Sequence, residues 1–206
     1  MKNLGSFVVL LPLLVLMLGL GQLNGEHYLD MGKRSSFDKL PRDYYPTPEK
    51  AVAPLLDHLP REISFCEPCA GDGRLVSHLE KYFDAVCFFA CDTEPNADWI
   101  IKKDANKLNS EEVEWCEMII TNPPFTWKTL KPLMDVFLSL RPTILLLPAD
   151  YMHNQRMSHY MKLCSKVVSI GRLKWIEDSP YSGVDNYCWY WFDKDNKQQT
   201  EFYGSK

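Results

Sequence analysis

The chain has 206 residues and a formal net charge of −4, with 46% hydrophobic and 24% charged residues. This length suits one well-buried domain and little more. The acidic balance excludes a protein that covers nucleic acid with a uniformly positive surface, so any such contact must come from a local patch. The seven cysteines are scattered and odd in number. They indicate reduced thiols in a cytoplasmic protein rather than a secreted disulfide framework.

The first 30 residues differ from the rest of the chain. No charged residue occurs from Asn3 to Gly25, and residues 4–23 approach the length of about 20 apolar residues that a membrane span needs. A signal peptide, a membrane anchor and a mis-assigned start upstream of Met31 all fit this pattern. We favour the start at Met31, which makes the protein cytoplasmic. A membrane location is expected only if residues 4–23 are retained as an anchor.

A short helix is predicted next, from Pro48 towards Leu59. Thr47 suits the N-cap and Pro48 the first helical position, while Pro54 is expected to kink the helix. Tyr45 precedes a proline, which favours an extended or turn conformation. The segment is either a plain helix start or a lid whose backbone faces a ligand.

Residues 62–66 form a short apolar strand, 67–73 an acidic glycine turn and 74–82 a helix. This unit opens a doubly wound α/β domain.

The turn contains two glycines, Gly71 and Gly73, which allow a ligand to approach the backbone closely. It lacks the three-glycine dinucleotide pattern and the Walker lysine and hydroxyl. Glu67 and Asp72 would repel phosphate, and they suit a cationic, zwitterionic ligand instead.

Two further predicted strands end on acids. Residues 86–92 end at Asp92, about 20 residues past the glycine turn, which is where an acid can bind two ribose hydroxyls. Glu94 is the second choice for this role. Residues 99–105 contain Asp104, which could accept a hydrogen bond from an adenine amino group.

A strand over residues 114–120 leads into Asn122-Pro123-Pro124-Phe125. The Asn122 amide and the Pro123 carbonyl, fixed side by side, can accept hydrogen bonds from one planar amino group, and Phe125 can stack on its ring. A mere turn is the alternative, but two adjacent prolines after an apolar strand favour function. A helix over 130–140 and a buried strand over 143–147 follow.

Residues 151–175 contain no Asp or Glu. A phosphate-facing lobe and a solvated helix face fit this segment equally well. The candidate nucleic-acid contacts are its five basic side chains, Arg156, Lys162, Lys166, Arg172 and Lys174. A late aromatic strand over 187–192 completes the sheet, and residues 193–206 read as a polar tail.

Cys66 and Cys69 form a C-x-x-C pair, with Cys87 and Cys91 not far beyond. A zinc site is one interpretation and buried free thiols are the other. Because Cys66 and Cys87 fall inside apolar strands and only one tight pair exists, buried thiols are favoured and no metal is expected.

Four segments in this order, residues 43–48, 67–73, 91–95 and 122–125, resemble S-adenosylmethionine-dependent amino-methyltransferases. Within them the likeness is to small phage-type DNA adenine-N6 methyltransferases, and it runs over residues 31–192, which form one methyltransferase domain. The resemblance implies a Rossmann-like methyltransferase fold, an α/β fold with a mostly parallel seven-stranded doubly wound sheet and an antiparallel C-terminal strand.

The resemblance also implies roles for individual residues. Asn122, Pro123, Pro124 and Phe125 would bind a target base flipped out of the duplex. S-adenosylmethionine would be held by ten residues, with Asp92 at its ribose and Asp104 at its adenine: Tyr45, Thr47, Pro48, Glu67, Cys69, Gly71, Asp72, Gly73, Asp92 and Asp104.

Other functions stay open. The same turn resembles that of methyltransferases acting on ribosomal-RNA guanine N2 or on protein glutamine. A non-catalytic cofactor-binding or membrane-tethered interaction protein is the alternative of another class. The acid-free basic segment favours nucleic acid over protein, and the Tyr-Pro-Thr-Pro segment favours DNA over RNA. Only about 80 residues follow the Asn-Pro-Pro-Phe turn, so target recognition is expected to be short, relaxed or supplied by a dimer.

Overall fold

A computed structural model describes residues 44–178, 180 and 182–205. The apolar segment 4–23 and the alternative start at Met31 lie outside this range. Within it, no helix combines the length and the apolar character needed to cross a membrane.

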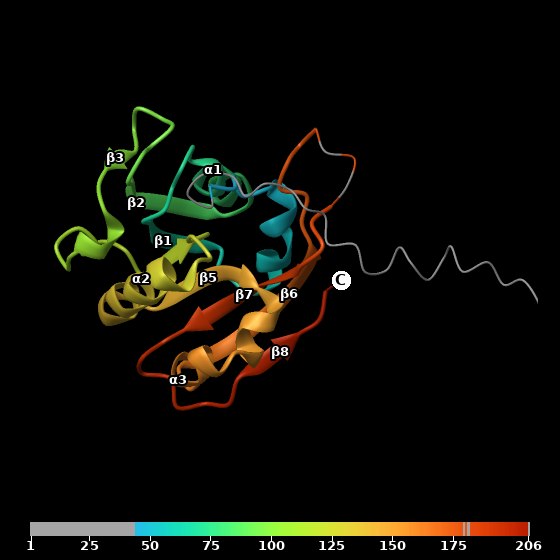
Figure 1. Cartoon of the computed structure of the whole chain (residues 1–206). Helices are drawn as coiled ribbons and strands as arrows, with labels where there is room; N and C mark the ends of the chain where they lie inside the picture. Colours follow the sequence, from blue (N-terminus) through green and yellow to red (C-terminus); the bar gives the residue numbers. More distant parts are fainter. Residues whose placement is uncertain (1–43, 179, 181, 206) are drawn as a thin grey trace, which may run out of the picture. The chain divides into compact units, whose positions relative to one another are not determined.

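An eight-stranded sheet in the order β3-β2-β1-β4-β5-β7-β6-β8 organises the described residues (Figure 1). The first five strands of the sheet are parallel: β1 (Glu62–Glu67), β2 (Asp84–Asp92), β3 (Ile101–Lys102), β4 (Met118–Thr121) and β5 (Thr143–Pro148). The remaining three are β6 (Cys164–Arg172), β7 (Asn186–Phe192) and β8 (Glu201–Tyr203). β7 runs antiparallel to both β5 and β6, and β8 runs parallel to β6. The predicted mostly parallel sheet with an antiparallel late strand is therefore confirmed.

Apolar clusters cover both faces of the sheet. On one face, α1 (Arg74–Tyr82) packs with the 3-10 helices η2 (Glu49–Ala51) and η3 (Ala53–Asp57). On the other, α2 (Trp127–Leu140) packs with α3 (Ser158–Met161) and its neighbours. Every β5 residue before Pro148 is buried, as expected for a strand covered on both faces.

The predicted helix after Pro48 is instead the two 3-10 helices η2 and η3. Pro54 has no backbone N–H to donate, so an uninterrupted α-helical ladder cannot pass through it. Pro48 rather than Thr47 occupies the N-cap, and no side chain caps η2. The Trp189 indole donates to the Ala51 carbonyl at 2.7 Å, which fixes η2 to β7.

Other elements differ from the sequence expectation. The third strand covers only Ile101–Lys102, because Asp104 accepts the Asn106 N–H at 2.9 Å and begins the 3-10 helix η4 (Ala105–Lys107). The expected polar tail contains β8, which makes the sheet eight-stranded rather than seven-stranded.

The basic segment is not the solvated helix face that one of its two interpretations offered. It consists of η5 (Ala149–His153), η6 (Gln155–Met157), α3 and the long strand β6. Val167, Val168 and Ile170 of β6 are buried, so apolar burial decides the conformation of this strand.

Candidate functional site

Polar residues gather where three neighbouring parallel strands end. β1 ends at Glu67 and β2 at Asp92, while Asn122 directly follows β4. The chain order switches between β1 and β4, because β2 pairs with one side of β1 and β4 with the other. Open α/β sheets bind ligands outside the carboxyl ends of their strands at such a switch point.

The glycine turn is hydrogen-bonded to the end of β2 and lies close to two aromatic rings. Gly71 and Gly73 have φ angles of 56° and 81°, a left-handed region that disfavours side chains. The Gly71 N–H donates to Asp92 Oδ2 at 2.9 Å. A Cβ on Gly71 would lie 2.7 Å from the Tyr44 ring, and one on Gly73 would lie 2.3 Å from the Trp99 ring. The absence of side chains at these two glycines therefore leaves room for the Tyr44 and Trp99 rings.

Glu67 is a buried acid, with 1% of its surface exposed. Its Oε1 accepts a hydrogen bond from the Thr121 hydroxyl at 2.5 Å, and its Oε2 has no hydrogen-bond partner among the described residues. Burial, reinforced by the negative charge of Asp92, raises the pKa of Glu67 to about 8, although the Thr121 hydroxyl and the nearby Cys69 main chain lower it. Glu67 is therefore mostly protonated at pH 7.

Two other acids stand nearer to solvent. Asp72 pairs with Arg74 at 2.9 Å, and Arg74 pairs with Glu177 at 2.6 Å. These partly exposed pairs contribute little stability, but they connect the glycine turn with the loop after β6. Asp104 Oδ1 accepts hydrogen bonds from both the main-chain and the side-chain nitrogen of Asn106 at 2.9 Å.

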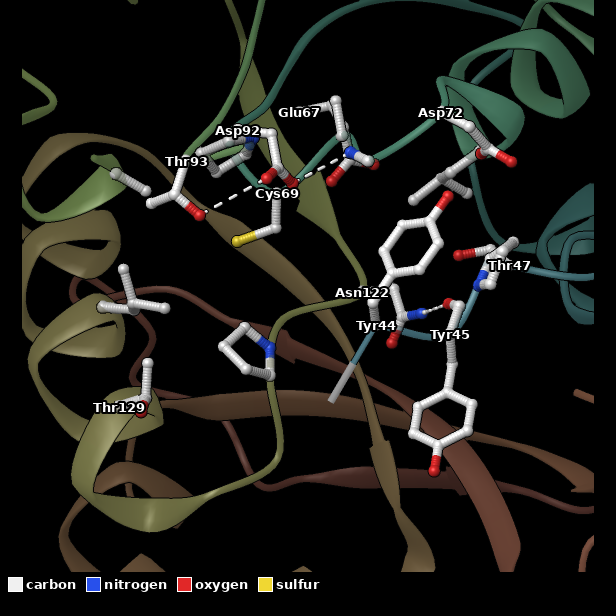
Figure 2. A pocket seen from close by; sticks show the side chains of 18 of the residues that line it. Tyr44, Tyr45, Thr47, Glu67, Cys69, Asp72, Asp92, Thr93, Asn122 and Thr129 are labelled. Atoms are coloured by element: carbon white, nitrogen blue, oxygen red, sulfur yellow. Dashed lines mark hydrogen bonds between the residues drawn. The ribbon is translucent and has the colours of Figure 1, made fainter. Parts of the chain in front are cut away.

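The Asn122 side chain is oriented by the main chain of the segment before η2. Its Nδ2 donates to the Tyr45 carbonyl at 3.0 Å (Figure 2). Its Oδ1 is buried and has no hydrogen-bond partner within the described part of the chain. A buried acceptor without a partner carries a free-energy cost of about 1–3 kcal/mol. A ligand donor at this position would remove that cost.

Phe125 belongs to an aromatic cluster beside Asn122. Its ring centroid lies 5.7 Å from that of Tyr187 and 6.3 Å from that of Trp175. Trp175 in turn lies 5.8 Å from Tyr45. The Tyr151 hydroxyl donates to the Phe125 carbonyl, so both the ring and the main chain of Phe125 are held in place.

A cavity of about 590 Å³ opens over these strand ends (Figure 2). Most of the predicted site residues line it: Tyr45, Thr47, Glu67, Cys69, Gly71, Asp72, Asp92, Asp104, Asn122 and Pro124. Four of the predicted cofactor and target-binding residues, Pro48, Gly73, Pro123 and Phe125, are not part of its wall, and neither are the five basic candidates.

The wall is acidic. Glu67, Asp72, Asp92 and Asp104 contribute carboxyl groups, and none of the lining residues is Lys, Arg or His. Such a wall disfavours a phosphate and suits a ligand that carries positive charge.

The structure places the basic candidates of β6 at opposite ends of that strand. Arg172 pairs with Asn186 at the carboxyl end of β5, the same edge as the cavity, and Lys174 follows it. Lys162 and Lys166 lie towards the other end of β6, which pairs next to the start of β5. The Lys166 ammonium stands over two aromatic rings at 5.4 Å and 5.8 Å. Arg156 is exposed in η6.

The structure adds site residues that sequence reasoning missed. Tyr44 and Thr93 line the cavity, as do Thr126 and Thr129 near the start of α2. The Tyr-Tyr pair before the Pro-Thr-Pro segment was a usable signal for Tyr44. Thr121 gave no signal, because its partner Glu67 is 54 residues away in sequence.

Among residues 44–178, 180 and 182–205, no group of three or more His, Cys, Asp or Glu side chains is arranged to hold a metal ion. Burial raises the pKa values of the Cys66 and Cys69 thiols, as for inert core cysteines.

Comparison with solved structures defines the fold. A protein from Pyrococcus horikoshii classed as an RNA methyltransferase superposes with a TM-score of 0.57 at 14% identity, covering 83% of this chain and 98% of that one. One from Listeria monocytogenes classed as a class I S-adenosylmethionine-dependent methyltransferase gives 0.54 at 7% identity, covering 82% and 68%. A chain of a type I restriction-modification system gives 0.53 at 14% identity, covering 81% and 46%.

The chain therefore has the class I S-adenosylmethionine-dependent methyltransferase fold. No protein-family model and no curated protein matches it.

Proposed function

We propose that this protein is an S-adenosylmethionine-dependent methyltransferase whose substrate is a planar amino group, the N6 amino group of adenine in DNA. One observation carries the proposal. Asn122 Oδ1 is a buried acceptor without a partner in the described part of the chain, and Asn122 lines an acidic cavity at the switch point of the sheet.

The cavity fits the cofactor that the fold implies. Its volume of about 590 Å³ lies within the usual range for small-molecule sites. Its four carboxyl groups and the unpartnered Glu67 Oε2 suit a ligand with a sulfonium and an ammonium group. S-adenosylmethionine supplies a methyl group on a positively charged sulfur.

Different residues of the cavity wall would hold different parts of the cofactor. Tyr45, Thr47 and the glycine turn would surround its methionine end, Asp92 would bind the ribose, and Asp104 would accept from the adenine amino group. Asp92 already orients the turn through the Gly71 N–H, so one side chain would serve both turn and ligand.

Asn122 would act as an acceptor only. Its Nδ2 is committed to the Tyr45 carbonyl, so Oδ1 is the atom left for a substrate N–H. Accepting that hydrogen bond, together with the Pro123 carbonyl, would draw the amino hydrogens out of the ring plane and localise the lone pair on nitrogen. The protein's contribution is then positioning and electrostatic stabilisation, without a strong base.

Nucleic acid as the substrate is supported by Arg172, which lies at the same end of the sheet as the cavity, by Lys174, two residues further on, and by the aromatic cluster around Phe125. A base must leave the duplex to reach Asn122, and aromatic rings favour an unstacked base. Two of the similar structures are described as a type I restriction-modification complex and an RNA methyltransferase.

The test is the fate of the methyl group in cells that express the full chain, compared with cells that express Asn122→Ala. Long-read modification mapping of DNA is combined with mass spectrometry of RNA nucleosides and of protein. N6-methyladenine in DNA that depends on Asn122 is the expected result. New methyl groups confined to RNA or protein would overturn the DNA assignment, and none in any pool would overturn the methyltransferase assignment.

A further inference from the structure

Glu67 is a buried acid that no cation of the described chain balances. It is 1% exposed, and the charge that acts on it is the negative charge of Asp92. Asp92 faces it from the end of β2. The thiols that interact with its charge come from β1, the glycine turn and β2: Cys66, Cys69, Cys87 and Cys91.

Its two oxygens have different surroundings. Oε1 accepts the Thr121 hydroxyl at 2.5 Å, and Oε2 has no partner among the described residues. The Cys69 main chain also lies close enough to the Glu67 carboxyl to lower its pKa, but Oε2 makes no hydrogen bond to the described residues, so Oε2 is the oxygen left for a ligand in the cavity. Thr121 directly precedes Asn122 in the chain. The hydrogen bond from Thr121 therefore connects Glu67 with the segment that carries the proposed target-binding side chain.

A buried carboxylate without a cation is costly and is avoided by protonation. A ligand cation beside Glu67 would instead favour the ionised carboxylate, because the two opposite charges attract each other. Proton and cation therefore compete for one oxygen.

We propose that Glu67 holds a proton in the ligand-free protein and releases it when the positively charged end of the cofactor enters, so that cofactor binding and proton release are one event. The O–H bond of the carboxylic acid breaks, the proton passes to solvent, and the carboxylate pairs with the cation. This inference rests on the proposed function, because it takes S-adenosylmethionine as the ligand.

Isothermal titration calorimetry tests it with the full chain and S-adenosylmethionine at pH 7. Titrations in buffers of different ionisation enthalpy give the number of protons released per cofactor bound. With a pKa of about 8, wild type should release about 0.9 proton more than Glu67→Gln, which cannot ionise.

Two further variants make the test specific. Thr121→Val removes a hydrogen bond that lowers the pKa, so its release at pH 7 should stay near one proton. Asp72→Asn removes a different wall acid, whose charge Arg74 already balances, and should leave the proton count unchanged even if affinity falls. Below the pKa, wild-type affinity should rise about tenfold per pH unit, and in Thr121→Val this rise should continue to higher pH.

Equal proton release by wild type and Glu67→Gln, with both binding the cofactor, would overturn this inference and leave the proposed function standing. An affinity that is flat between pH 6 and 7 would overturn it as well. Absence of any cofactor binding would overturn both.

Discussion

At the residue scale, the orientation of Asn122 depends on a main-chain atom far away in sequence. The Tyr45 carbonyl accepts the Asn122 Nδ2 hydrogen across 77 positions. Asn122 itself was predictable from the turn that follows an apolar strand. Its orienting partner was not, because every residue type offers a carbonyl and only the folded chain brings this one to Asn122.

Asp92 gives the residue-scale prediction. Its Oδ2 holds the Gly71 N–H at 2.9 Å and its Oδ1 holds the Glu94 N–H at 2.9 Å. Asp92→Ala should weaken cofactor binding by about 10–100-fold, because it removes the proposed ribose contact. It also removes two charge-assisted hydrogen bonds to the main chain, each of which contributes about 1.5–3 kcal/mol. Calorimetric titration with S-adenosylmethionine measures this loss.

Asp84→Ala is the matched control, because Asp84 is exposed at the other end of the same strand. Its affinity for the cofactor should stay at the wild-type value. Equal losses in the two variants would mean that Asp92 acts only through the stability of β2.

At the element scale, local chemistry decided what the sequence could predict. The helix over 74–82 was predicted with its observed bounds, because the glycine turn marks its start and the apolar periodicity its face. The strand expected over 99–105 was wrong beyond Ile101–Lys102, since Asp104 satisfies backbone donors locally and ends the strand. β6 was missed because its polar residues Ser165, Lys166 and Ser169 alternate irregularly with three buried apolar residues, Val167, Val168 and Ile170.

The glycine turn supports an element-scale prediction. Gly71→Ala places a Cβ 2.7 Å from the Tyr44 ring at a φ of 56°, so it combines left-handed strain of about 1–2 kcal/mol with a displaced ring at the cavity wall. We expect cofactor affinity to fall at least about tenfold, as measured by calorimetry, together with a lower midpoint of urea unfolding.

Gly171→Ala is the control that separates the effect of backbone strain from the effect of displacing the Tyr44 ring. Gly171 has a φ of 83°, and a Cβ added there would meet nothing within 4 Å. The substitution should therefore cost similar strain and leave cofactor affinity unchanged. A matching loss of affinity in Gly171→Ala would contradict a specific role for the space above Gly71.

At the scale of the whole molecule, the sheet order brings the site together. β4 pairs with β1 although β2 and β3 lie between them in the chain, and the ends of β1, β2 and β4 deliver Glu67, Asp92 and Asn122 to one cavity. The family resemblance predicted this convergence. Composition could not predict this convergence. Composition also suggested one basic lobe, whereas Lys166 and Arg172 lie at opposite ends of β6.

The most direct measurement compares methyl transfer and cofactor binding in wild type, Asn122→Ala and Asn154→Ala. Asn154 is an exposed asparagine whose side chain makes no capping hydrogen bond, so its variant should behave as wild type. Asn122→Ala should lose at least about 100-fold in transfer from labelled S-adenosylmethionine to DNA, the scale of one preorganised polar contact in a transition state. Its cofactor dissociation constant should stay within about twofold of wild type, because Asn122 would contact the substrate amino group. Near-wild-type transfer by Asn122→Ala would contradict the proposed site.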